Sequence, residues 1–282
     1  MKNNLKALLG KVLRAEEMQY VPNSFELIGS NGKIIALVEI PNEIKDRKTI
    51  IAETIMKMNK NVKSVLEKSS ARKGEFRTRE YEVIAGSSET EVLHKEHGYW
   101  LKLDPQKVYF SPREGTERQR VAKEAKWGEN VLVMFSGISS FPIAIASEQP
   151  DVGRIIAIEI NLEAHKYALE NVRINRLSHK IVPINGDVKV ILPKLDMHFD
   201  RILMPLPLEA YNFLELAILY LNKDGVIHFY FIGKEPNVFS ETEELIKRRI
   251  EQLGKNIKAL NKKRVLQYSP RAWKCVMDIY LS

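Results

Sequence analysis

The C-terminal part of the chain alternates short apolar runs with segments of helical periodicity. The apolar runs lie at residues 130–135, 154–160, 181–186, 201–206 and 225–232, and the helical patterns at about 141–149, 162–175, 208–221 and 239–253. Two more runs, VLQYSP and KCVMDIYL, follow near the end. Strands that are apolar along their whole length and joined by helices predict a parallel sheet covered by helices on both faces.

The first 105 residues show a shorter and more mixed pattern. Leucines and a valine recur at helical spacing between residues 5 and 13, and a strand-like stretch at 28–40 contains an Asn-Gly turn. An amphipathic helix is expected at 48–60, followed by the strand-like runs VKSVLEK, EYEVIAG and HGYWLKLD. We therefore predict a small α+β domain at 1–105 and a larger doubly wound α/β domain at 106–282.

Composition excludes several classes of protein. The 282 residues are 44% hydrophobic and 28% charged, and no apolar stretch approaches the roughly 20 residues that cross a bilayer. The opening MKNNLKALLGKVLRAEE is too charged for a signal peptide, so we expect a cytoplasmic protein without membrane contact. Cys275 is the single cysteine, which excludes an internal disulfide and a cysteine-built zinc site, and we expect no metal.

The formal charge of +8 makes a polyanion a candidate partner, although many basic enzymes bind no nucleic acid. Residues 57–79 hold eight basic and two acidic residues. Within this stretch Lys68, Arg72, Lys73 and Arg79 are the candidates for contacts with phosphates. The alternative is a solvated basic face with no ligand.

Small and acidic residues follow three of the predicted strands. Phe135-Ser136-Gly137 leads from the first strand into a helix, Glu159 ends the second, and Asp187 follows the third. Each could be a simple turn or a helix cap, but the carboxyl ends of parallel strands meet at one edge of a sheet, where such folds bind ligands. The three sites together predict a binding site for a small molecule.

The sequence also limits which cofactor this site could hold. It has neither the three-glycine turn of nicotinamide binders nor the Lys-Ser/Thr pair of a P-loop. S-adenosylmethionine has no phosphates, so a shorter loop is sufficient, and acidic strand ends can hold its ribose and adenine. It is therefore the natural candidate.

Several motifs resemble those of one enzyme family. They are KVYFSPR, ERQRVA, NVLVMFSGIS, IAIEIN, ALENVRINRL, INGDVKV and DRILMPLP, with GEFRTREYEVIAG in the first half. They resemble the archaeal and eukaryotic tRNA (guanine-37 N1)-methyltransferases and the related aminocarboxypropyltransferases of wybutosine synthesis. The resemblance implies a Rossmann-like class I methyltransferase domain. It also implies methyl transfer from S-adenosylmethionine to N1 of the guanine next to the anticodon, or to a wyosine intermediate derived from that guanine.

The resemblance also implies roles for individual residues. Glu117 would be the base that removes the proton from guanine N1, although by itself it is also compatible with an acid at a helix start. Arg77, or Arg79 as the alternative, would stabilise the negative charge on the guanine oxygen, and Tyr109 would shape the pocket. Arg113 would contact RNA.

The same comparison assigns the cofactor site and the partner. Glu159 and Asp187 would hold the ribose and adenine, and the remaining cofactor contacts are Phe135, Ser136, Gly137 and Pro207. The partner would be the anticodon stem-loop of tRNA, bound by a monomer.

Three positions depart from the family pattern. Val133 replaces an acid, Ser139 a glycine, and Pro205 an asparagine. These changes keep two alternatives open, a non-catalytic tRNA-binding paralogue and an aminocarboxypropyltransferase. The Leu-Pro pair that follows Pro205 favours the methyltransferase branch.

Overall fold

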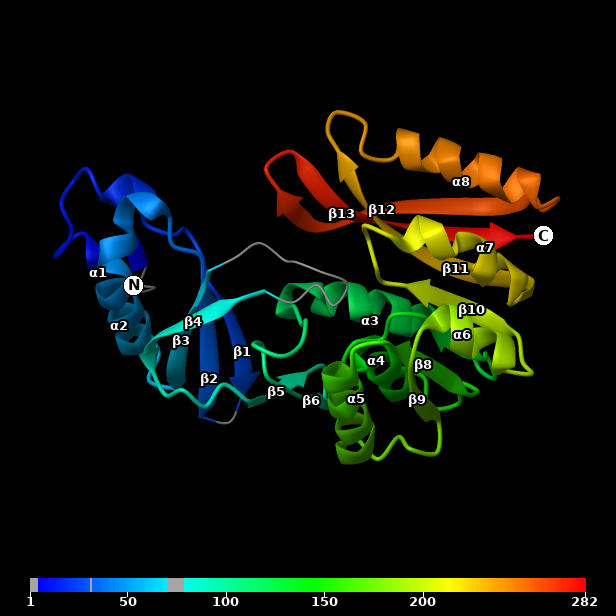
Figure 1. Cartoon of the computed structure of the whole chain (residues 1–282), viewed down its shortest axis with the longest axis horizontal. Helices are drawn as coiled ribbons and strands as arrows, with labels where there is room; N and C mark the ends of the chain where they lie inside the picture. The colour runs from blue at the N-terminus through cyan, green and yellow to red at the C-terminus, as the bar shows by residue number, and fades with distance from the viewer. Residues whose placement is uncertain (1–4, 31, 70–78) are drawn as a thin grey trace. The chain divides into compact units, whose positions relative to one another are not determined.

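The computed structural model describes residues 5–30, 32–69 and 79–282. The chain divides into two compact units, Met1–Pro112 and Arg113–Ser282 (Figure 1).

The N-terminal unit is built on a four-stranded sheet with the order β1-β2-β3-β4. The strands are β1 (Glu26–Ser30), β2 (Lys33–Val38), β3 (Val62–Lys68) and β4 (Tyr81–Gly86). Strands β2 and β3 are parallel, and the two outer pairs are antiparallel. The helices of this unit are α1 (Leu5–Leu9), η1 (Met18–Tyr20), η2 (Asn42–Arg47) and α2 (Lys48–Met58). Apolar residues of α1 and α2 form one buried cluster with β2 and β3.

A two-stranded hairpin, β5 (Val92–Glu96) and β6 (Tyr99–Leu103), completes this unit. It is attached to β1, because the Gly29 amide donates to His94 Nδ1 (3.2 Å) and the Lys95 amide donates to Ser30 Oγ (2.9 Å). Strand β5 was not predicted from the sequence, because VLHKE has two adjacent apolar residues and no alternation.

The C-terminal unit contains a seven-stranded sheet with the order β12-β13-β11-β10-β7-β8-β9. The strands are β7 (Val131–Val133), β8 (Ile155–Glu159), β9 (Ile181–Asn185), β10 (Phe199–Met204), β11 (Leu221–Lys234), β12 (Ile257–Ser269) and β13 (Ala272–Leu281). The predicted parallel arrangement is correct for β7 to β11 and wrong for β13, which runs against β11 and β12. The short turn between β12 and β13 allows only an antiparallel hairpin.

Helices cover both faces of this sheet (Figure 1). The helices α3 (Gly115–Glu124), α4 (Ser140–Glu148) and α5 (Leu162–Ile174) lie on one side, with η3 (Pro112–Glu114) before α3. The helices α6 (Val188–Ile191), α7 (Leu214–Leu219) and α8 (Ser240–Gln252) share one buried apolar cluster with the strands, and η4 (Leu192–Lys194) and η5 (Ala210–Phe213) extend α6 and α7. The α/β class I architecture with a smaller N-terminal α+β part is thus confirmed.

None of the helices in the described ranges is long and apolar enough to cross a membrane.

Candidate active site

The loop after β7 brings backbone amides to the carboxyl edge of the sheet. Ser136 donates its amide hydrogen to the Ile158 carbonyl (2.9 Å), which joins the loop to β8. Gly137 has φ +56°, a left-handed conformation that suits glycine, and a Cβ atom at this position would meet nothing within 4 Å. The backbone at Gly137 therefore borders open space that a ligand could fill.

Glu159, the last residue of β8, holds this loop in place. Its Oε2 accepts the Gly137 amide (2.7 Å), and its Oε1 accepts the Asn161 amide (2.8 Å). These two hydrogen bonds place the carboxylate beside the loop after β7. A carboxylate can accept hydrogen bonds from hydroxyl groups such as those of a ribose.

Asp187 lies at the neighbouring strand end. The Gly186 amide donates to the Glu159 carbonyl (3.0 Å), so the ends of β8 and β9 are in contact. Oδ1 of Asp187 accepts the Lys189 amide (2.8 Å) and caps α6. Asp187 therefore does act as a helix cap, which was one of the alternatives for this residue, and its carboxylate is half-buried.

Phe135 connects the first loop to the segment after β10. Its ring packs edge-to-face against Phe213 of η5, with ring centroids 4.9 Å apart. Pro205 and Pro207 follow β10 and are half-buried. The residues predicted for the cofactor thus come from four adjacent loops of one unit.

The polar groups around the loop after β7 fit a small polar ligand. Among the described residues, the buried hydroxyls of Ser136 and Ser139 have no hydrogen-bond partner. Buried polar groups normally have one, so these two hydroxyls leave polar capacity in the loop that a ligand or water could use. Val133, which is fully buried in β7, adds no polar group. The residues present are compatible with an adenosine-containing cofactor.

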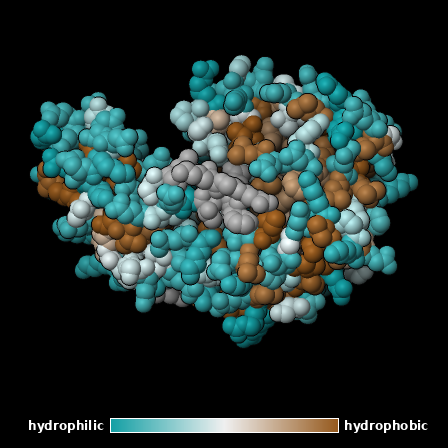
Figure 2. All heavy atoms as spheres, viewed as in Figure 1, coloured by the Kyte–Doolittle hydropathy of each residue, from teal (hydrophilic) through white to brown (hydrophobic). Residues whose placement is uncertain are grey.

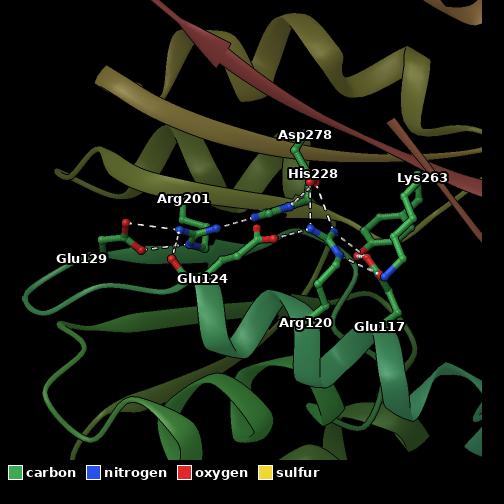
Figure 3. Close-up of polar contacts among 9 residues, drawn as sticks. Glu117, Arg120, Glu124, Glu129, Arg201, His228, Lys263 and Asp278 are labelled. Carbon is green, nitrogen blue, oxygen red and sulfur yellow. Dashed lines mark hydrogen bonds and ion pairs between the residues drawn. The ribbon is translucent and has the colours of Figure 1, made fainter. Parts of the chain in front are cut away.

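Glu117 lies in the first turn of α3 and is 3% exposed. Arg120, one turn later, donates Nη2 to Oε1 (2.7 Å) and Nε to Oε2 (2.9 Å). The Tyr230 hydroxyl of β11 donates to Oε1 (2.8 Å). Lys263 Nζ of β12 lies 3.8 Å from Oε2 (Figure 3).

These contacts leave one acceptor position on the Glu117 carboxylate. Oε1 accepts two hydrogen bonds and is saturated, whereas Oε2 accepts one. The cations Arg120 and Lys263 lie beside the carboxylate that would act as the base. Burial and the nearby Glu117 carboxylate raise the pKa of Tyr230 well above its usual value, so its hydroxyl remains a donor.

A chain of buried charges continues from Arg120 across the sheet (Figure 3). Arg120 Nη1 contacts Asp278 Oδ2 (2.8 Å), and Asp278 Oδ1 lies 2.6 Å from His228 Nδ1. His228 Nε2 lies 2.6 Å from Arg201 Nη1, and Arg201 pairs with Glu129 (2.8 Å). The positive and negative groups thus alternate along the chain.

The pKa values along this chain follow from burial and pairing. Burial lowers the pKa of Arg120, but Glu117 and Asp278 outweigh that effect and raise it. Burial raises the pKa of Asp278, but the hydrogen bond from His228 and the charge of Arg120 hold it below its usual value. Both groups are therefore charged at neutral pH.

His228 is held as one neutral tautomer. The guanidinium of Arg201 can only donate, so His228 Nε2 must accept, and Nδ1–H must donate to Asp278. Glu124, His228 and Asp278 lie close enough to suggest a metal site. Because both imidazole nitrogens already have partners, these three residues do not form one.

Glu117 was predicted from the sequence, whereas Arg120, Tyr230, His228 and Asp278 were not. A signal existed for two of them, because His228 and Asp278 are polar residues inside the apolar strands GVIHFYFI and KCVMDIYL. A buried charge in such a strand needs a partner. The sequence could not show which partner that was.

The other predicted residues lie in several places. Arg113 is exposed in η3. In the N-terminal unit Tyr109 is half-buried, Arg79 lies 3.7 Å from Glu39, and Lys68 pairs with Glu26 (2.7 Å). Three predicted residues, Arg72, Lys73 and Arg77, lie outside the described residues. The approach of Arg79 and Tyr109 to Glu117 stays a prediction.

Comparisons with known proteins match both parts of the chain. Residues 92–258 match the TRM5/TYW2 methyltransferase domain, and residues 5–90 match the TYW2 N-terminal domain. The tRNA (guanine(37)-N(1))-methyltransferase Trm5b of Pyrococcus abyssi is 40% identical, over 95% of this chain and 77% of that protein. A tRNA(Phe) (4-demethylwyosine(37)-C(7)) aminocarboxypropyltransferase of Pyrococcus horikoshii is 31% identical, over 99% of this chain and 96% of that protein.

Solved structures agree with the sequence matches. The crystal structure of Trm5b from Pyrococcus abyssi has a TM-score of 0.86 and covers 96% of this chain and 79% of that one, at 40% identity. A complex of aTrm5 with tRNALeu has a TM-score of 0.85 at 32% identity and covers 100% of this chain and 79% of that one. On its sequence and its fold, this chain belongs to the TRM5/TYW2 methyltransferase family.

Proposed function

We propose that this protein is a tRNA (guanine-37 N1)-methyltransferase that uses S-adenosylmethionine. The observation that carries the proposal is the Glu117 carboxylate, which is buried, held by Arg120 and Tyr230, and left with one acceptor position on Oε2. The relatives named as Trm5b act on this guanine, and a solved structure of Methanocaldococcus jannaschii Trm5 contains adenosine.

The reaction needs a base, because guanine N1 carries a proton that must leave as the methyl group arrives. Oε2 of Glu117 accepts the N1–H hydrogen, and Arg120 keeps the carboxylate oriented. The cofactor, when bound, supplies an electrophilic methyl group. Arg77, or Arg79 in its place, stabilises the charge that develops on the guanine oxygen, and Tyr109 bounds the base pocket.

The loops at the carboxyl edge of the sheet hold the cofactor in this proposal. Glu159 accepts hydrogen bonds from the ribose hydroxyls, and Asp187 lies beside the adenine. Phe135, Ser136, Gly137 and Pro207 border the remainder of the molecule. The open space at Gly137 and the position of the Glu159 carboxylate beside the Gly137 amide support these assignments.

The proposal also includes the partner. The anticodon stem-loop binds to Lys68, Arg72, Lys73, Arg79 and Arg113, and the target guanine is unstacked to reach Glu117. The enzyme acts as a monomer in the cytoplasm.

The direct test is nucleoside analysis of the product. The purified protein is incubated with S-adenosylmethionine and two tRNA transcripts that differ only in having guanosine or adenosine at position 37. We expect N1-methylguanosine in the first transcript alone. An aminocarboxypropyl adduct on tRNA containing 4-demethylwyosine would assign the chain to the second branch of the family. No product on any of these RNAs would contradict an enzymatic function.

Replacing Glu159 by glutamine should weaken S-adenosylmethionine binding by about tenfold or more. The amide loses the charge and one acceptor, and a charge-assisted hydrogen bond contributes about 1.5–3 kcal/mol. Calorimetry measures the affinity. Glu163→Gln, which removes an acid paired with Lys166 on α5, is the matched control and should bind normally. Equal affinities of the two variants would remove Glu159 from the cofactor site.

A further inference from the structure

A second basic segment lies in the C-terminal unit, outside the stretch that the sequence analysis singled out. Residues 255–271 contain six basic residues and no acidic residue, against a net charge of +8 for the whole chain. All six are exposed, and we refer to them as the basic edge: Lys255, Lys258, Lys262, Lys263, Arg264 and Arg271. This segment is therefore as basic as residues 57–79, where basic residues exceed acidic ones by the same number.

Strand β12 carries four of these residues and forms the outer strand of the sheet. Figure 2 shows hydrophilic residues predominating along the border where Figure 1 places α8 and β12. Lysines on an outer strand can serve simply to prevent edge-to-edge aggregation. That role requires exposed charge, but it does not require proximity to a catalytic group or aromatic neighbours.

The basic edge has both of these additional features. Lys263 lies 3.8 Å from Oε2 of Glu117, so one point of the edge reaches the candidate base. Arg264, the next residue of β12, lies over the Trp273 ring (5.1 Å), and Tyr268 is 39% exposed. Guanidinium groups and aromatic rings side by side are typical of surfaces that bind single-stranded RNA.

Part of the positive charge has no acidic partner. Lys258 pairs with Asp224 (2.7 Å) and Lys262 with Glu243 (2.8 Å). No ion pair joins Lys255, Arg264 or Arg271 to an acid among the described residues. A phosphate group could therefore bind to these three without displacing a carboxylate.

We propose that the basic edge binds the phosphate backbone of the tRNA strand next to the target guanine. This inference rests on the proposed function, because it takes the RNA to be the substrate of Glu117. Each phosphate contact releases counterions, so the contacts should appear in the salt dependence of binding. Lys263 marks the place where the RNA strand would pass the Glu117 carboxylate.

The test uses the full-length protein and neutralises the three cations without acidic partners. The variant combines Lys255→Gln, Arg264→Gln and Arg271→Gln, none of which contacts Glu117. The control variant combines Arg154→Gln, Lys166→Gln and Arg173→Gln, which removes the same charge from exposed positions just before β8 and on α5. The dissociation constant for a tRNA transcript with guanosine 37 is measured at several salt concentrations, together with the affinity for S-adenosylmethionine.

We expect the first variant to bind this tRNA at least tenfold more weakly at low salt. The slope of log affinity against log salt concentration should also be shallower by about 2, because three phosphate contacts are lost. The control variant should keep the slope of the parent, and all three proteins should bind S-adenosylmethionine equally. Equal slopes for both variants, with a parent that methylates tRNA, would overturn this inference alone. A parent that neither binds nor methylates tRNA would overturn the proposed function and this inference together.

Discussion

Replacing Glu117 by glutamine should lower the single-turnover rate of methyl transfer by a factor of about 10²–10⁴. Glutamine keeps the size of the side chain but cannot take the N1 proton. It also keeps one oxygen for the Tyr230 hydroxyl and loses the charge that pairs with Arg120. The rate is measured with excess enzyme at saturating tRNA and cofactor, so that binding does not limit it.

Glu124→Gln is the matched control for this experiment. Glu124 lies on the same helix and accepts from Arg120 Nη1 (2.7 Å), but none of its oxygens contacts Tyr230. Its replacement should change the rate only a few-fold. Affinity for tRNA should be the same in both variants and the parent. If Glu117→Gln retained the parental rate, the assignment of Glu117 as the base would be wrong.

Replacing Asp278 by asparagine should lower the free energy of unfolding by about 3 kcal/mol near neutral pH. Asp278 is 4% exposed and joins Arg120 to His228, and the loss of one member of a buried ion pair typically costs about 3–5 kcal/mol. An amide accepts the His228 Nδ1–H but leaves Arg120 with one acid fewer. Urea unfolding of the parent and the variant measures the difference.

The loss of unfolding free energy caused by Asp278→Asn should become smaller at acidic pH. The pKa of Asp278 is lower in the folded protein than its ordinary value of 3.8, so its contribution is complete above that value and is lost as the pH falls through the folded pKa. The difference between parent and variant should therefore be constant from pH 5 to 8 and shrink below about pH 4. Asp224→Asn, which removes an exposed acid paired with Lys258, should have little effect at any of these values. A difference that grew on acidification would show that Asp278 is not stabilised in its charged form.

Much of the fold could be predicted from local pattern. The apolar runs at 130–135, 154–160 and 225–232 correspond to β7, β8 and β11, because strands inside a sheet that is covered on both faces are apolar over most of their length. The run at 181–186 corresponds to β9, which is apolar although it is the outer strand. The hairpin β5–β6 was only half recognised, since the five residues of β5 include two adjacent apolar ones. The direction of β13 was wrong, because a strand's apolar pattern is the same in either direction.

Part of the candidate site could also be predicted from local sequence, and part could not. The positions of Glu159 and Asp187 follow from strand ends, and these are visible in the sequence as a change from apolar to acidic residues. The environment of Glu117 does not follow from any local pattern. Its partners Arg120, Tyr230 and Lys263 come from three elements, and the contacts with Tyr230 and Lys263 span more than a hundred residues.

The sequence by itself determined the α/β class, the order of most strands and helices, the acids at the strand ends and the family motifs, because each depends on residues close together in the chain. Only the tertiary structure decided that Glu117 keeps one free acceptor position, that His228 is held as one tautomer between Arg201 and Asp278, and that the basic edge reaches the candidate base at Lys263. The physical reason is that hydrogen bonds and ion pairs act over a few ångströms in space. Folding brings residues 230, 263 and 278 within that range of Glu117 or Arg120, and no spacing along the chain encodes these contacts.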